Sequence, residues 1–173
     1  MKYTMSVQAL KQWRNAVLMM ACFWLVACTD PLSIKQPIDV TCSGQSVRFD
    51  FTIHKMGDYQ FALLFENWIN HEEMLRRTAL IGDLHKNGVV IPVALNLVKD
   101  GRVYFDDEMK TVGSWWSYSF FFQGRRVSTD GRNIKILSLS PGHYSATITI
   151  LKGAADFRGV DSFVHVSYYE PKI

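Results

Sequence analysis

Few of the reactive side chains in this sequence stand at spacings typical of catalysis or metal binding. The five histidines are widely separated, and His71-Glu72-Glu73 departs from the His-Glu-x-x-His zinc helix because Leu75 occupies the place of the second histidine. No Gly-x-Ser-x-Gly elbow, Cys-x-x-Cys pair or phosphate-binding glycine loop occurs. The sequence therefore predicts a protein that is not an enzyme and needs no metal or cofactor, although distant residues can still converge in a fold.

A cluster of acidic residues offers the strongest local candidate for cation binding or acid–base chemistry. Asp106-Asp107-Glu108 follows Asp100 and supplies oxygen ligands of the kind calcium prefers, but its spacing and glycine position differ from those of an EF-hand loop. Paired carboxylates also hydrolyse glycosides, yet adjacent side chains on a strand point to opposite faces. We therefore interpret the cluster as a solvated acidic turn.

The clearest chemical signal is a cysteine that closes an apolar run near the N-terminus. Leu25-Val26-Ala27-Cys28 ends an apolar stretch over 16–27, which follows a basic segment and is shorter than the roughly 20 residues that span a membrane. The order resembles the lipobox of bacterial lipoproteins, which implies that residues 1–27 are a signal peptide and that Cys28 is acylated. An ordinary cleaved signal peptide and an uncleaved anchor are the alternatives, but the polar Thr29-Asp30-Pro31 favours lipidation.

The residue after the lipidated cysteine indicates which bacterial membrane holds the protein. In the lipoprotein pattern an aspartate at that place favours retention in the inner membrane, whereas this chain has Thr29. For a Gram-negative cell, the resemblance therefore implies a protein held in the outer membrane by the lipid on Cys28, with its domain in the periplasm or on the cell surface.

Charge and cysteine content narrow the class of partner. Three of the 19 basic residues and none of the 16 acidic residues precede Cys28, so the mature chain would carry no net formal charge. A nucleic-acid partner is therefore not expected. Cys22 falls in the leader and Cys28 is assigned to the lipid, which leaves Cys42 without an intramolecular disulfide partner.

The remainder of the chain predicts a single β domain over 46–173, preceded by a lipidated tether over 28–45 that is polar and contains Pro31 and Pro37. Strict alternation of apolar and polar residues over 47–53 predicts the first strand. Further strand patterns occur over 59–65, 89–99, 103–105, 118–122, 134–139, 146–150 and 163–166. About eight strands with frequent turns indicate an antiparallel β-sandwich, immunoglobulin-like or jelly-roll-like, with a closed barrel as the alternative.

Local signals predict one short helix and three turns within this domain. Asn70 is a candidate N-cap for a helix that ends before Gly82, with Met74, Leu75 and Leu80 on one face. Asp100-Gly101 predicts a tight hairpin. Two tyrosines follow Gly-x at the start of apolar strands, and we expect their hydroxyls to bond back to the main chain and fix the turn, as at a tyrosine corner; they are Tyr59 and Tyr144.

The densest aromatic segment begins at Trp115-Trp116 and runs through 122. Alternation along a strand sends at least one of two adjacent tryptophans away from the core. An exposed tryptophan is a good anchor for a protein or a sugar ring, and arginine is also frequent at binding hot spots. The candidate binding patch is therefore Trp115, Trp116, Tyr118, Arg125 and Arg126, with a core strand as the alternative interpretation.

Several short motifs give the chain a resemblance to small proteobacterial lipoproteins that contain the domain of unknown function DUF5625. The resemblance covers most of the chain after Cys28 and implies a β domain of the cell envelope, with no catalytic residues to carry over. Besides the lipobox, the motifs are Gln45–Phe51, Gly57–Tyr59, Gly88–Val93, Arg132–Lys135 and Pro141–Tyr144.

Three functions remain open from the sequence. The first is a protein-interaction module in the periplasm, in its most specific form an immunity protein that neutralises an effector delivered there. The second is a glycan- or cell-wall-binding module that uses Trp115-Trp116. The third is a hydrolase whose histidines and acidic residues meet only in three dimensions. The partner and the oligomeric state are not encoded in any motif.

Overall fold

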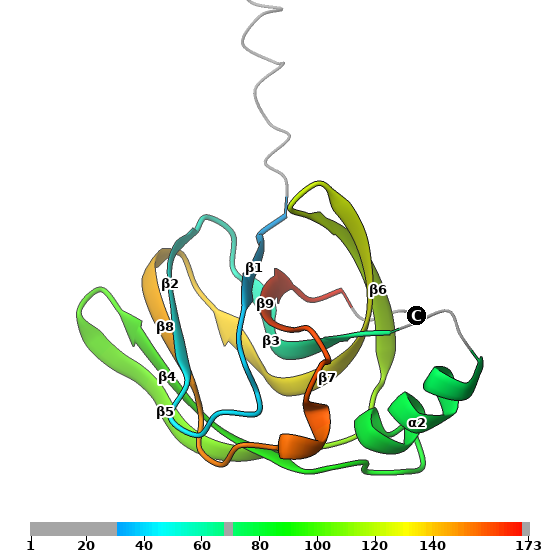
Figure 1. The fold of residues 1–173 in the computed structure, drawn as a ribbon. Helices are drawn as coiled ribbons and strands as arrows, with labels where there is room; N and C mark the ends of the chain where they lie inside the picture. The colour runs from blue at the N-terminus through cyan, green and yellow to red at the C-terminus, as the bar shows by residue number, and fades with distance from the viewer. Residues whose placement is uncertain (1–30, 68–70, 171–173) are drawn as a thin grey trace, which may run out of the picture. The chain divides into compact units, whose positions relative to one another are not determined.

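The computed structural model describes residues 31–67 and 71–170 (Figure 1). Residues 1–30, with the predicted signal peptide and Cys28, lie outside this part, and none of the helices within it is long and apolar enough to cross a membrane. Its elements are β1 (Ser33–Pro37), β2 (Ser46–Ile53), β3 (Gly57–Glu66), α2 (His71–Ile81), β4 (Ile91–Lys99), β5 (Arg102–Thr111), β6 (Trp116–Phe122), β7 (Arg125–Leu139), β8 (Gly142–Ile150), the 3-10 helix η2 (Ala155–Phe157) and β9 (Ser162–Tyr168).

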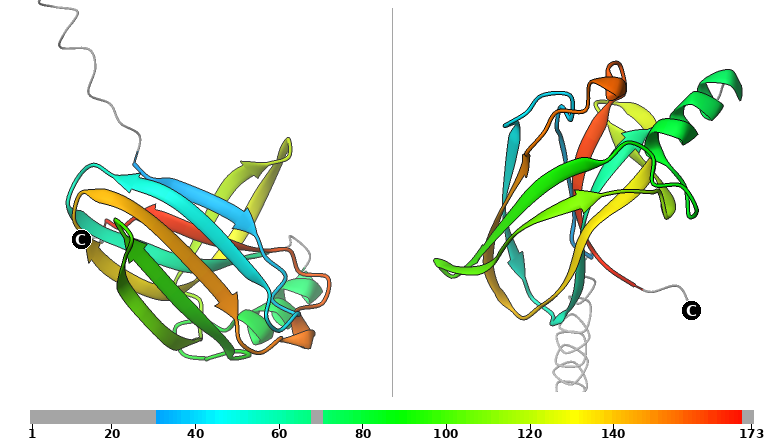
Figure 2. Two further views of the ribbon diagram at one scale, coloured as in Figure 1. Left: turned by 90° about the vertical axis from the view of Figure 1, so that its left-hand side faces the viewer. Right: turned by 90° about the horizontal axis from the view of Figure 1, so that it is seen from below.

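The strands form two antiparallel sheets, as the two turned views of Figure 2 show. One sheet has the order β1-β9-β3-β7-β6 and curls into a half-barrel, and we call it the curled sheet. The other has the order β2-β8-β4-β5. The predicted mostly-β class with one short helix is confirmed, with nine strands in the described residues where about eight were expected.

The main core lies between the two sheets. Alternation along β2, β4 and β8 buries every second side chain, and aliphatic and aromatic residues fill these positions. The curled sheet contributes the inward side chains of β3 and β9 to the same cluster. Fully buried members include Phe61, Leu63, Leu95 and Ile148.

The folded domain begins earlier than the predicted boundary at residue 46. Strand β1 lies inside the expected tether and pairs with β9 from Ser33↔Ser167 to Pro37↔Phe163. Ile38 and Val40 follow it into the main core. A strand of five residues that ends in proline shows too little alternation to be found in the sequence, and proline is tolerated because β1 is an edge strand.

Both predicted tyrosine corners are present. The Tyr59 hydroxyl donates to the Lys55 carbonyl at 3.0 Å, and the Tyr144 hydroxyl donates to the Ser140 carbonyl at 2.8 Å. The predicted hairpin turn at Asp100-Gly101 is also confirmed, since both residues have positive φ angles, as a two-residue hairpin turn requires. The two tyrosine hydroxyls therefore fix turns, which accounts for the place of Tyr59 and Tyr144 in the sequence motifs.

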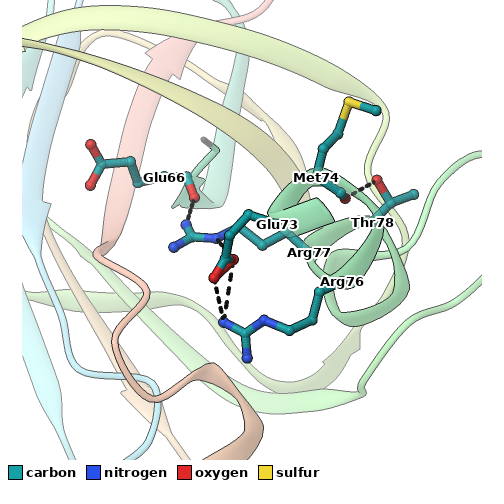
Figure 3. Close-up of polar contacts among 6 residues, drawn as sticks. All are labelled: Glu66, Glu73, Met74, Arg76, Arg77 and Thr78. Atoms are coloured by element: carbon teal, nitrogen blue, oxygen red, sulfur yellow. Dashed lines mark hydrogen bonds and ion pairs between the residues drawn. The ribbon is translucent and has the colours of Figure 1, made fainter. Parts of the chain in front are cut away.

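The helix occupies the predicted place, and Figure 3 shows the polar contacts that attach it to Glu66, but its buried face differs from the expected one. Met74 and Leu75 are exposed, whereas Arg77 and Ile81 are buried. Arg77 donates to the main-chain carbonyl of Glu66 and thereby attaches the helix to the end of β3. The expected apolar face was wrong because this short helix is held largely by polar contacts and by its last turn.

A buried arginine holds that last turn. Arg132 on β7 is fully buried and donates to the carbonyls of Leu80, Ile81 and Val89 at 2.5 to 2.8 Å. Its guanidinium carbon lies over the rings of Phe65 and Phe157, 5.3 and 5.5 Å from their centroids. Burial lowers the pKa of Arg132 to about 10. The cation therefore caps the carboxyl end of α2, where a positive charge is favourable.

Candidate binding site on the curled sheet

The aromatic segment singled out in the sequence forms β6, which is an edge of the curled sheet. Its side chains alternate between the concave face of that sheet and the outer face. The outer face carries Ser117, Ser119 and Phe121. The concave face carries Trp116, Tyr118, Phe120 and Phe122.

The concave aromatic residues pack against β9 and form a second, smaller core. Phe163 makes edge contacts with Phe120 and Phe122, with ring centroids 5.3 and 5.1 Å apart. His165 stacks on Tyr118 at 5.0 Å and lies 6.0 Å from the Trp116 ring. These contacts curl β6 over β9, so most of the aromatic segment serves the fold.

Gly131 makes room for the largest of these rings. It pairs with Trp116 across the β6–β7 ladder, and a Cβ atom at this position would lie 2.5 Å from the indole. The indole therefore packs flat on the β7 main chain. Glycine in a strand interior often marks such a close approach.

Polar side chains from β1 and β9 complete the concave face. The Lys35 ammonium lies 5.2 Å from the Tyr118 centroid and 5.5 Å from that of Phe120, and it donates to the Ser33 hydroxyl at 2.8 Å. The same hydroxyl lies 3.0 Å from Nε2 of His165. The His165 side chain therefore faces a polar neighbour on the adjacent strand β1 and not solvent.

His165 is neutral at physiological pH because it is buried. It is 3% exposed, and burial, assisted by the positive charge of Lys35, lowers its pKa to about 4. Its Nδ1 atom and Nε1 of Trp116 are buried without a hydrogen-bond partner from the described residues. This end of the concave face is consequently sensitive to protonation.

The outer face of the β6–β7 hairpin presents apolar surface to solvent. Phe121 is 78% exposed, and Trp115, directly before β6, is 65% exposed. Arg126 lies opposite Phe121 in the ladder and is also exposed. The predicted patch is therefore divided: Trp115 and Arg126 are on the surface, whereas Trp116 and Tyr118 lie on the half-buried concave face.

Arg125, the remaining residue of the predicted patch, fixes the hairpin to the body of the domain. Its guanidinium forms a two-pronged ion pair with the buried carboxylate of Glu66 on β3 and contacts Asp161 at 2.6 Å. Hydrogen bonding to Glu66 raises the pKa of Arg125. The hairpin, which projects from the sheets in Figure 2, is thus held near its turn by two carboxylates, Glu66 on β3 and Asp161 directly before β9.

A surface pocket of about 610 Å³ opens beside this turn. Its apolar floor comes from Ile38, Phe157 and Phe163, and Arg158 and Asp161 lie among its polar residues. Apolar floors with a polar rim suit an anchoring side chain of a partner. Because Phe122 and Gln123 also line it, the pocket lies at the turn end of the β6–β7 hairpin.

The other candidate chemical groups are dispersed. Within residues 31–67 and 71–170, no three His, Cys, Asp or Glu side chains lie close enough to hold a metal ion. Asp106, Asp107 and Glu108 are exposed as expected, but they lie within β5 and not in a turn. Cys42 is exposed, and its thiol donates to the Asp39 carboxylate at 3.2 Å.

Comparison with known proteins supports the fold. A crystal structure of a protein from Sulfurospirillum deleyianum superposes with a TM-score of 0.63 at 17% sequence identity, over 82% of this chain and all of that one. No curated protein matches the sequence. The family model for the domain of unknown function DUF5625 matches residues 35–168, which span β1 to β9. The chain therefore belongs to the DUF5625 family.

Proposed function

We propose that this chain is a non-enzymatic, lipid-anchored protein of the bacterial envelope that binds a protein partner with the outer face of its β6–β7 hairpin. The observation that carries the proposal is the exposure of Phe121 beside Arg126 on a hairpin whose concave face is already packed. Burying a phenylalanine side chain contributes about 2 kcal/mol, so a partner that covers Phe121 would gain about that much binding free energy.

The hairpin has the rigidity that a binding surface needs. Arg125 joins it to Glu66 and Asp161, and the rings of its concave face are packed on Phe163. A surface that is ordered before binding loses little conformational entropy in the complex. Aromatic and arginine side chains are also the residue types that dominate binding hot spots.

The anchoring part of the proposal is supported by the sequence alone. The segment that ends in Leu25-Val26-Ala27-Cys28 has the order of a lipoprotein leader, and Thr29 favours the outer membrane. In the most specific form of the proposal, the partner is a toxic effector delivered to the periplasm, which this chain neutralises. A toxin gene beside the gene for this chain and its relatives would support that form.

A second candidate is supported by a different residue. Trp115 presents most of its indole to solvent, and an exposed indole is a common platform for a sugar ring. Cell-wall fragments are then the partner, and Trp115→Ala would abolish binding to purified peptidoglycan. Protein binding ranks first because Phe121 and Arg126 extend the surface along the hairpin.

The test uses the full-length chain with a C-terminal tag, cross-linked in intact cells and purified. We expect one protein to co-purify in near-stoichiometric amount, and Phe121→Ala to weaken its binding about 30-fold, as loss of a hot-spot residue worth about 2 kcal/mol would. Val103→Ala is the matched control, because Val103 is an exposed apolar residue on β5. Equal capture by both variants would contradict the proposal.

A further inference from the structure

The edge of β6 differs from the other sheet edges of the described domain. The edges are β1 and β6 in the curled sheet and β2 and β5 in the other. Strand β1 carries Lys35 and Pro37, β2 carries Arg48 and Asp50, and β5 carries five charged residues. Strand β6 has neither charge nor proline over seven residues. Charges and prolines are what keep exposed edges from pairing with other chains, so β6 lacks the usual protection.

The hairpin geometry determines which main-chain groups β6 offers. Gln123 and Gly124 have φ angles of 48° and 79°, which is typical of a two-residue hairpin turn closed by a hydrogen-bonded pair, here Phe122 and Arg125. Bonding alternates along an antiparallel strand. The residues that direct their N–H and C=O groups to the free edge are therefore Ser117, Ser119 and Phe121.

We propose that this edge pairs antiparallel with β6 of a second copy of the chain, about a two-fold axis at Ser119. In this register Ser119 lies opposite Ser119 of the second copy, and Ser117 lies opposite Phe121. Each residue that directs its N–H and C=O groups to the free edge then pairs with such a residue of the second copy. The hydrogen-bond ladder of each curled sheet thereby continues into the other. A shift by two residues would leave one such residue of each copy without a partner.

The side chains of β6 agree with the same register. Residues opposite each other in an antiparallel pair point to the same face, so the concave face would join Trp116 to Phe122 and Tyr118 to Phe120 of the second copy. No like charges meet, since β6 has none. On the outer face Phe121, the most exposed large hydrophobic residue of the described domain, would cover Ser117 of the second copy.

This inference goes beyond the proposed function and does not depend on it. Pairing uses the main chain of β6, whereas partner binding uses the outward side chains of Phe121 and Arg126. In the joined sheet both Phe121 side chains remain on the outer face. A variant that loses dimerisation but keeps partner binding, or the reverse, therefore tests one proposal without affecting the other.

The test is a disulfide at the two-fold axis. Ser119→Cys is introduced into the full-length chain together with Cys42→Ser, which removes the exposed thiol. Residues opposite each other in a hydrogen-bonded pair have Cα atoms about 5.5 Å apart, within the range of a disulfide. After expression in cells and oxidation of the membrane fraction, we expect a covalent dimer on a non-reducing gel.

Ser128→Cys in the same background is the matched control. Ser128 is exposed on β7 and contacts the Ser119 hydroxyl at 3.0 Å, so it shares the outer face but lies one strand from the edge. In the joined sheet the two copies of Ser128 would be roughly 14 Å apart, three strand spacings, which is too far for a disulfide. We expect dimer from S119C and at most about a tenth as much from S128C.

A second measurement covers the wild-type protein in detergent. Analytical ultracentrifugation should give a dimer that Ser119→Lys converts to monomer, because like charges would meet at the axis, and that Ser128→Lys preserves. Equal dimer from S119C and S128C, or a monomeric wild-type chain, would overturn the inference. A cross-link from S119C to a different protein would overturn it too, and would assign this edge to a foreign strand.

Discussion

Replacing Arg132 with methionine should destabilise the domain more than any change on the hairpin surface. Within the described part of the chain, the carbonyls of Ile81 and Val89 accept side-chain hydrogen bonds from this guanidinium alone, whereas the Leu80 carbonyl also accepts from the Val89 N–H at 2.8 Å. Methionine has similar length and no donor, so it fills the space and leaves both carbonyls without these bonds.

The magnitude follows from those two carbonyls. A buried acceptor left unsatisfied costs about 1–3 kcal/mol, so the two together cost about 2–6 kcal/mol. Part of this is offset because methionine does not have to bury a charge, a cost that is visible in the lowered pKa of Arg132. We therefore expect a loss of about 3 kcal/mol, which corresponds to a decrease in Tm of roughly 10 °C for a domain of this size.

The assay is thermal and urea unfolding of the full-length chain in detergent, followed by circular dichroism. Arg126→Met makes the same chemical change at an exposed position and should alter stability by less than about 0.5 kcal/mol. Arg132→Lys should be nearly as destabilising as the methionine variant, because one ammonium cannot reach carbonyls on both sides of the guanidinium. An R132M protein that unfolds within about 2 °C of the wild type would refute the assigned role.

Three further predictions concern other residues. His165 binds its proton near pH 6.5 in the unfolded chain but only near pH 4 in the folded chain. The free energy of unfolding should therefore fall by up to about 3 kcal/mol as the pH decreases between these values. His165→Gln should flatten a plot of the urea midpoint against pH over that window. Cys28→Ala should abolish labelling with a fatty-acid analogue and leave unprocessed precursor; labelled mature protein would refute lipidation. Gly131→Ala should displace the Trp116 indole, shift tryptophan fluorescence and cost about 1–3 kcal/mol by overpacking, and an unchanged spectrum and midpoint would contradict the close contact.

The sequence was sufficient for elements with strong local signals. Alternation over 47–53 predicted β2, and the turn chemistry of Asp100-Gly101 and the Gly-x-Tyr corners predicted contacts that the structure contains. Each of these signals depends on residues close together in the chain. The helix was found for the same reason, from the capping pattern and Gly82.

Features that depend on distant residues could not be predicted in the same way. Strand β1 was interpreted as part of the tether, because a five-residue edge strand is stabilised by pairing with β9 and has no clear sequence pattern of its own. The first part of β7 was missed because Thr129 and Gly131 occupy buried positions where a strand pattern needs large apolar residues. At the candidate site, His165 and Lys35 join the aromatic strand only because β1, β9 and β6 curl together.

The most direct test of the account is to place a photo-cross-linking amino acid at position 121 of the full-length chain in living cells. Position 121 is the most exposed aromatic site of the hairpin, and position 103 on β5 is the control. Irradiation should link position 121, besides any adduct with a second copy of the chain, to one other protein, and position 103 should give no adduct with that protein. Identical adduct patterns at the two positions, or none at 121, would contradict the conclusion that this hairpin binds a protein partner.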